Sequence, residues 1–204
     1  MDVSIIFYLI ILIFSVIIHE IAHGSVANVL GDPTAKNAGR LSLNPLKHLD
    51  FFGSFLVPFF LIILQSPVLI GWAKPVPINP FNFKNPQRDE VKVALAGPLA
   101  NFSIALIFGL FIRFISLPEP LLILFSFIVA LNLVLAIFNL IPLPPLDGSH
   151  LLFSVLSPKF NKIKLFLHQY GLLILFFFIF FCLSYVFLLV RWIFLLITGQ
   201  PLVI

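Results

Sequence analysis

Residues 15–26 read SVIIHEIAHGSV, and they place two histidines and a glutamate directly after a start, residues 1–18, that is almost wholly apolar. The whole chain has the same character, because 61% of its 204 residues are hydrophobic and only 10% are charged. A typical soluble domain has about a quarter of its residues charged. The composition therefore predicts a membrane protein.

Four apolar runs are long enough to cross about 30 Å of hydrocarbon, which takes roughly 20 helical residues. They are residues 3–24, 91–116, 120–142 and 169–190. The first lacks the basic start and small-residue cleavage site of a signal peptide, so we expect it to be retained as a helix. We predict an all-α multi-pass membrane protein of about four to six membrane segments. Residues 1–204 would form a single domain, with its core at 3–155 and a C-terminal membrane helix at about 166–198.

The basic residues are spread over three loops, at 31–50, 71–92 and 143–165, while the turn SLPEP at 116–120 carries only Glu119. Cytoplasmic loops of membrane proteins carry an excess of Lys and Arg. The three loops are therefore predicted to face the cytoplasm and the turn to face outward. Because no basic tract is present, the charge gives no sign of a nucleic-acid partner.

The apolar run at 51–70 conflicts with this topology, because it lies between two loops that are both predicted to be cytoplasmic. It contains Gly53, Pro58 and Pro67, which suit a broken helix. We therefore expect a re-entrant or irregular extended element between residues 39 and 90, protected by other parts of the protein. The alternative is an ordinary kinked spanning helix beside a loop that violates the charge rule.

His19, Glu20 and His23 form the pattern HExxH. On a helix, positions i and i+4 share a face, so both imidazoles can reach one metal ion while the glutamate acts on water beside it. Ionisable residues inside a membrane cost several kcal/mol and normally mark a functional site. The alternative is a pair of histidines that are hydrogen-bonded within a helix bundle.

A catalytic zinc ion usually takes three protein ligands and keeps one position open. Most of the other acidic residues fall at the chain end, in charged loops or in the outer turn. Asp147 differs, because it lies in FNLIPLPPLDGSH at 138–150, directly after a predicted helix has returned to the cytoplasmic face. His23 lies at a similar depth, so Asp147 is the candidate third ligand.

HEIAHG followed by NLIPLPPLDG resembles the paired signature of the site-2 protease family, which are membrane-embedded zinc metalloproteases that cleave substrate helices within or near the bilayer. The segments at 39–58, 71–80 and 97–102 also resemble the small bacterial and archaeal members that have no appended domain. Larger relatives carry a PDZ domain between the two core helices, where this chain has only SLPEP.

The resemblance implies a role for each matching residue. His19, His23 and Asp147 match the ligands of one Zn²⁺ ion, and Glu20 matches the catalytic glutamate. Asn139 matches the asparagine that is thought to hold the substrate backbone, and Asn101 matches the asparagine of the GPxxN segment. We expect both to bind the substrate or stabilise the transition state.

The expected function is therefore that of an intramembrane zinc endopeptidase in the cell membrane, with its active site toward the cytoplasmic side. Its partners would be the lipid bilayer and a protein substrate with a transmembrane helix. Such a substrate must unwind, and its freed backbone groups need partners. The proline-containing stretch WAKPVPINP at 72–80 could supply them as an extended edge.

Two other functions are compatible with histidines and acids in membrane helices. A metal transporter would need polar residues along a path across the bilayer, and the later helices offer mainly Asn101, Arg113, Asn132 and Asn139. A catalytically silent scaffold would normally lack a ligand or the base, and all of these residues are present. The enzyme is therefore the favoured interpretation.

Overall fold

The computed structural model describes residues 3–56, 59–60, 63 and 73–202. Within them the regular structure is helical, and four helices are long and apolar enough to span a membrane. They are α1 (Val3–Val29), α4 (Pro86–Phe114), α5 (Glu119–Asn139) and α7 (Asn161–Thr198). The prediction of an all-α multi-pass membrane protein is confirmed.

Shorter helical elements occupy the connections. They are α2 (Thr34–Asn37), η1 (Pro45–Lys47), η2 (Phe51–Leu56), η3 (Pro80–Asn82), α6 (Gly148–Val155) and η4 (Pro158–Phe160). Residues 73–79 are neither helix nor strand, as expected of an irregular element between 39 and 90. Most of the run at 51–70 lies outside the described residues, so the choice between a re-entrant and a spanning segment does too.

The spanning helices begin and end at residues that the apolar runs do not mark. Helix α4 starts at Pro86, with proline in its first turn, and includes the polar residues before the apolar run. Helix α5 ends at Asn139, three residues before Pro142. Proline cannot donate the backbone hydrogen bond that a continuing helix requires. The ends of an apolar run therefore do not determine the ends of the helix.

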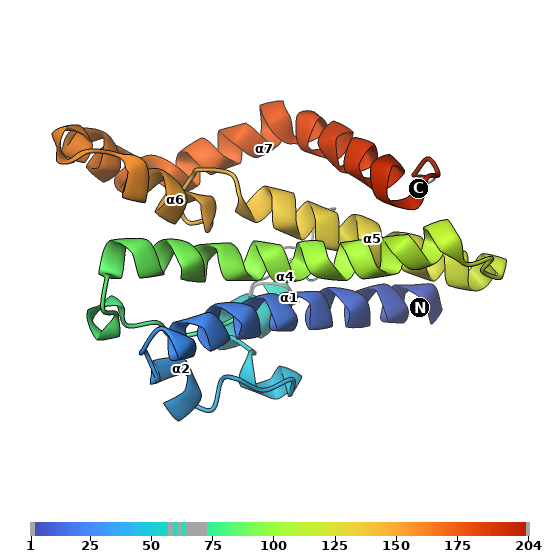
Figure 1. The fold of residues 1–204 in the computed structure, drawn as a ribbon, viewed down its shortest axis with the longest axis horizontal. Coiled ribbons are helices and arrows are strands. Elements are labelled where there is room, and N and C mark those ends of the chain that lie inside the picture. The colour runs from blue at the N-terminus through green and yellow to red at the C-terminus, as the bar shows by residue number, and fades with distance from the viewer. Residues whose placement is uncertain (1–2, 57–58, 61–62, 64–72, 203–204) are drawn as a thin grey trace.

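Helix α4 is the centre of the bundle and packs against α1, α5, α6 and α7. Figure 1 shows the four long helices lying side by side, with both chain termini at one end of the molecule. At the opposite end lie the C-terminus of α1, the N-terminus of α4, the C-terminus of α5 and the short helix α6. Segments far apart in the sequence are thereby brought together at that end.

The main apolar core lies between α4, α5 and α7, with Val129, Leu133, Val190 and Phe194 almost fully buried. Small residues allow this close contact, since a Cβ atom on Gly109 of α4 would collide with the Ile197 side chain of α7. In contrast, the phenylalanines at 176, 177, 180 and 181 are largely exposed, as expected of side chains that face lipid.

Candidate active site

His19 and His23 lie on one face of α1, as their spacing predicts. Both side chains are buried, and their Nε2 atoms are 3.0 Å apart. Glu20, between them in the sequence, is half-buried. Asp32 follows the end of α1 and belongs to a separate loop.

Asp147 reaches the two histidines from the other side of the bundle. Its Oδ2 atom lies 3.1 Å from Nε2 of His19 and 3.2 Å from Nε2 of His23. The chain turns sharply after α5, because Pro142, Pro144 and Pro145 cannot continue a helix. Gly148 allows the turn to close, since a Cβ atom there would lie 2.5 Å from the Ile141 carbonyl oxygen.

Hydrogen bonds fix which nitrogen of each imidazole carries the proton. Nδ1 of His23 lies 2.6 Å from the Val93 carbonyl oxygen, which can only accept, so Nδ1 is the donor. Nδ1 of His19 lies 2.5 Å from Oδ1 of Asn101. The Asn101 amide is oriented by its Nδ2 group, which donates to the Ser15 carbonyl and to Oδ1 of Asn132. In the neutral imidazoles, both Nε2 lone pairs therefore face the Asp147 carboxylate.

The three ligand atoms fit a metal ion. Two lone pairs and a carboxylate oxygen converge with no proton between them, an arrangement that repels itself unless a cation is present. Tetrahedral zinc bonds of about 2.1 Å place neighbouring ligand atoms roughly 3.4 Å apart, close to the separations found here. Oδ2 of Asp147 is also buried without a hydrogen-bond donor among the described residues. His19, His23 and Asp147 form the group of possible metal ligands within the described chain.

Gly97 of α4 covers the histidine pair. A Cβ atom at this position would lie 2.6 Å from Nε2 of His19 and would also collide with Nε2 of His23. Glycine is therefore required for α4 to approach the site this closely. Gly97 is the first residue of the segment at 97–102 that resembles the family, but no role was predicted for it. Its signal was the position four residues before Asn101, one helical turn away on the same face.

A buried polar network supports His19 from behind. Asn101 and Asn132 are completely buried and Ser15 is nearly so. Besides its two donated bonds, Asn101 accepts from His19, while Asn132 donates to the Ser15 hydroxyl at 3.0 Å. Both the oxygen and the nitrogen of the Asn101 amide are therefore hydrogen-bonded within the protein. No role was predicted for Ser15 from the sequence. Asn132 was considered only as one of the polar residues that a metal transporter would need along its path.

Glu20 contacts the irregular segment at 73–79, whose Val76 amide donates to Oε2 of Glu20 at 2.7 Å. This segment lies tightly on α1, since a Cβ atom on Gly24 would be 2.8 Å from Val76. Asn139 lies at the end of α5, half-buried, and its Nδ2 group donates to the Leu135 carbonyl one turn earlier.

The fold and the site together define a class of protein, a multi-pass membrane protein with the ligand set of a metallohydrolase inside its helix bundle. Comparison with known proteins narrows this class. The model of peptidase family M50 matches residues 119–181. YwhC of Bacillus subtilis (strain 168) is 40% identical over 178 residues, which are 82% of this chain and 77% of YwhC.

A second relative is Rip2 of Mycolicibacterium smegmatis, 30% identical over 167 residues, which are 79% of this chain and 62% of Rip2. The names of both relatives class them as zinc metalloproteases. No solved structure matches the chain. The chain belongs to peptidase family M50, the site-2 protease family of zinc metalloproteases, as its two motifs predicted.

Proposed function

We propose that this zinc metalloprotease is an intramembrane endopeptidase. It hydrolyses a peptide bond in or near a transmembrane helix of a membrane-protein substrate, and its active site opens toward the cytoplasmic side of the cell membrane. The observation that carries the proposal is the convergence of His19, His23 and Asp147 between helices that are apolar enough to span a bilayer. The basic loops at the same end of the bundle support the cytoplasmic orientation of the active site.

One zinc ion per chain would be held by His19, His23 and Asp147, whose ligand atoms converge. When bound, zinc supplies Lewis acidity, which polarises a peptide carbonyl and lowers the pKa of water. Ser15, Asn101 and Asn132 act on the site through His19, because their hydrogen bonds hold its ring and its tautomer. We therefore assign Asn101 to positioning His19 rather than to contact with substrate.

Glu20 is the general base and acid of the reaction. It takes a proton from the attacking water and passes it to the leaving amine. The Val76 amide of the irregular segment donates to the Oε2 atom of Glu20 at 2.7 Å and orients the carboxylate. Because Glu20 is adjacent to His19 in the sequence, the base and the ligand are held by the same turn of helix.

The substrate segment binds in an extended form beside residues 73–79. An unwound helix exposes amide and carbonyl groups that need partners in a water-poor site. The irregular segment is neither helix nor strand and lies next to Glu20, so its backbone is placed to pair with a substrate strand. Asn139 contributes an amide at the end of α5, close in sequence to the turn that carries Asp147.

Residues 1–204 form one membrane-embedded protease domain in this proposal. Its core covers 3–155, and the helix at about 166–198 forms part of α7 and completes the bundle. The partners are the lipid bilayer and the membrane-protein substrate.

The test compares membranes from cells that express the wild-type chain with membranes from cells that express Glu20→Gln. In both, the N-termini that cleavage creates in membrane proteins are identified by sequencing. The proposal predicts termini within or next to transmembrane helices that appear only with the wild-type chain. Termini that appear equally with Glu20→Gln would exclude Glu20 as the base. Termini confined to water-soluble domains would overturn the intramembrane substrate.

A further inference from the structure

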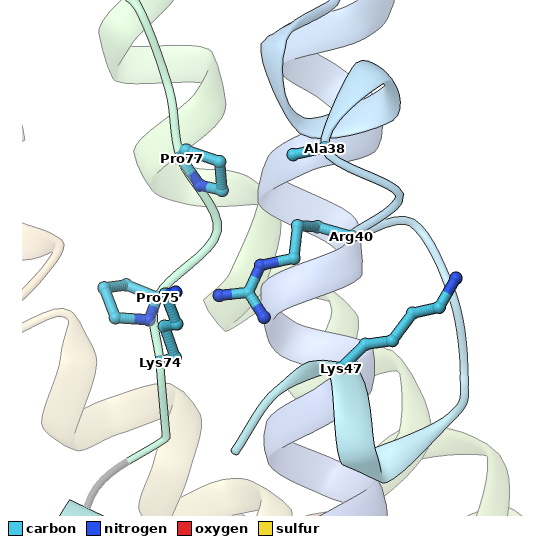
Figure 2. A pocket seen from close by; sticks show the side chains of 6 residues that line it. All are labelled: Ala38, Arg40, Lys47, Lys74, Pro75 and Pro77. Atoms are coloured by element: carbon cyan, nitrogen blue, oxygen red, sulfur yellow. The ribbon is translucent and has the colours of Figure 1, made fainter. Parts of the chain in front are cut away.

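A second polar site lies beside the protease site and shares the irregular segment with it, but its charged side chains have no step in the proposed reaction. It is a pocket of about 520 Å³, open to the surface, between the turn after α2, the helix η1 and the irregular segment. We call it the cationic pocket. The lining residues are Ala38, Arg40, Lys47, Lys74, Pro75 and Pro77 (Figure 2). Three of the six carry a positive charge, and none of these six carries a negative charge.

Arg40 is the feature that sets this pocket apart from an ordinary basic surface. Its side chain is only 8% exposed, yet its Nη2 atom is buried without a hydrogen-bond partner among the described residues. Figure 2 shows the guanidinium group reaching from the turn after α2 toward Lys74 and Pro75. A buried, charged donor without a partner is costly. An anion in the pocket would relieve this cost.

The walls of the pocket are held by the backbone. Gly39, with φ of +65°, ends α2 and lets the Arg40 amide donate back to the Ala35 carbonyl at 3.0 Å. The Lys74 amide donates to the His48 carbonyl at 2.9 Å, which ties the irregular segment to the end of η1. Backbone hydrogen bonds therefore hold in place the segments that carry Arg40, Lys47 and Lys74.

The surface next to the pocket is apolar. Leu43, Leu46, Leu49, Phe51 and Phe52 are all between 54% and 74% exposed. They flank Lys47 in the sequence, and an exposed group of this kind is unusual in contact with water. Apolar side chains that enter the acyl region beside Lys and Arg that meet headgroups are typical of segments bound at a membrane surface. The combination favours a lipid over a dissolved anion.

We propose that the cationic pocket binds the phosphate group of an anionic phospholipid of the surrounding bilayer. Arg40 donates from the floor of the pocket, and Lys47 and Lys74 add charge at its walls. The leucines and phenylalanines at 43–52 lie against the acyl chains of the same leaflet. The bound lipid contacts Lys74, Pro75 and Pro77, so it also stabilises the segment whose Val76 amide contacts Glu20.

The experiment measures lipid binding to the full chain in detergent by native mass spectrometry. The probes are dioleoyl phosphatidylglycerol and the zwitterionic dioleoyl phosphatidylcholine. The variants are Arg40→Gln, Lys47→Gln and Lys74→Gln, with Lys84→Gln as the matched control, since Lys84 is exposed and does not line the pocket. The two pocket lysines are exposed, so their variants test the site even when Arg40→Gln does not fold.

The wild-type chain is expected to prefer phosphatidylglycerol. Each lysine variant weakens its affinity about fivefold, and Arg40→Gln weakens it about tenfold or more, while Lys84→Gln leaves it unchanged. Competition by millimolar sodium phosphate for the bound lipid would support a phosphate site. Equal binding of both lipids, or equal loss in Lys84→Gln and the pocket variants, would overturn the proposal. A chain that binds inorganic phosphate but neither of the two lipids would reject the bilayer as the source of the anion.

Discussion

At the scale of single residues, the site depends on atoms that hold the histidines as much as on the histidines themselves. The spacing of His19 and His23 predicted a shared helix face. Asp147 was selected because it follows a helix that is predicted to return to the cytoplasmic face, and because its motif resembles that of the family. Gly97 and the Ser15 network could not be predicted in the same way. Their roles depend on which face of α4 meets α1, and no local pattern specifies that contact.

Gly97→Ala tests the close approach of α4 to the ligands. The added methyl group would lie within 2.6 Å of His19, so we expect zinc affinity to fall about 10-fold to 100-fold, as for other changes around metal ligands. Gly109→Ala is the matched control, because it places the same methyl group on the same helix against Ile197. It should lower thermal stability and leave zinc affinity unchanged. Equal zinc affinity in wild type and Gly97→Ala would contradict the geometry.

Asn101→Ala tests the support of His19. It removes the acceptor for the His19 Nδ1 proton and leaves two buried acceptors, Oδ1 of Asn132 and the Ser15 carbonyl oxygen, without their donor. We expect about 10-fold to 100-fold weaker zinc binding, measured by competition with a chelator of known affinity.

Asn139→Ala is the comparison for Asn101→Ala. Asn139 is bonded to the Leu135 carbonyl of its own helix, so its loss should spare zinc binding and instead raise the KM for a cleaved substrate. If zinc binding fell equally in the two variants, the distinction between positioning His19 and holding the substrate would be wrong.

At the scale of elements, Asp32 connects the end of α1 to the segment that contacts Glu20. Its carboxylate accepts from the Asn79 amide at 2.7 Å and from the Asn82 side chain at 2.7 Å, as well as from the Thr34 amide and hydroxyl. Burial alone would raise the pKa of Asp32, but these hydrogen bonds from Thr34, Asn79 and Asn82 outweigh it and hold the pKa below its ordinary value. The carboxylate is therefore a tie between two loops that are distant in the sequence.

The hydrogen bonds of Asp32 predict that the protection of the Asn79 amide from hydrogen exchange falls as the pH is lowered. A carboxyl whose pKa is lower in the folded state stabilises that state above its unfolded pKa of about 3.9, and the stabilisation is lost as pH falls through the folded pKa. We expect hydrogen exchange at the Asn79 amide to be slow at neutral pH and to lose its protection in acid. Asp32→Asn should show fast exchange at every pH, and protection that persists in this variant would exclude the tie.

The sequence predicted which helices are present better than it predicted the residues at which they begin and end. The irregular character of residues 73–79 followed from their prolines, and each long helix followed from its apolar run. The ends did not follow, since α4 starts five residues before its apolar run and α7 begins at Asn161 rather than near 166. Hydropathy measures transfer into lipid, whereas a helix end depends on capping and on proline, and these act on either side of the lipid boundary.

At the scale of the whole molecule, the order of the helices around α4 could not be predicted from the sequence. Nearly uniform apolar helices lack a polar face that would show which side is buried, because lipid and protein interior are equally apolar. The direction of each helix across the membrane stays a prediction, which rests on the basic residues in three loops. Because these basic loops lie at the end of the bundle that holds His19, His23 and Asp147, labelling the loops tests which side of the membrane the active site faces.

Single cysteines report that topology in intact cells. In a Cys182→Ala background, Glu119→Cys should react with a membrane-impermeant thiol reagent, whereas Lys159→Cys should react only after the membrane is opened. Both positions lie outside the spanning helices or at their first residue, so the changes should be tolerated. The reverse pattern of labelling would place the active site on the outer side.

The most direct test of the central claim is the zinc content of the purified full chain, measured by elemental analysis for wild type, Asp147→Ala and Glu20→Gln. The structure joins Asp147 to α1 through two contacts of 3.1 and 3.2 Å. We predict about one zinc ion per wild-type chain, as much in Glu20→Gln, and at most about a tenth of it in Asp147→Ala. A wild-type chain that binds no zinc after resupply, or Asp147→Ala that binds as much as wild type, would contradict the account.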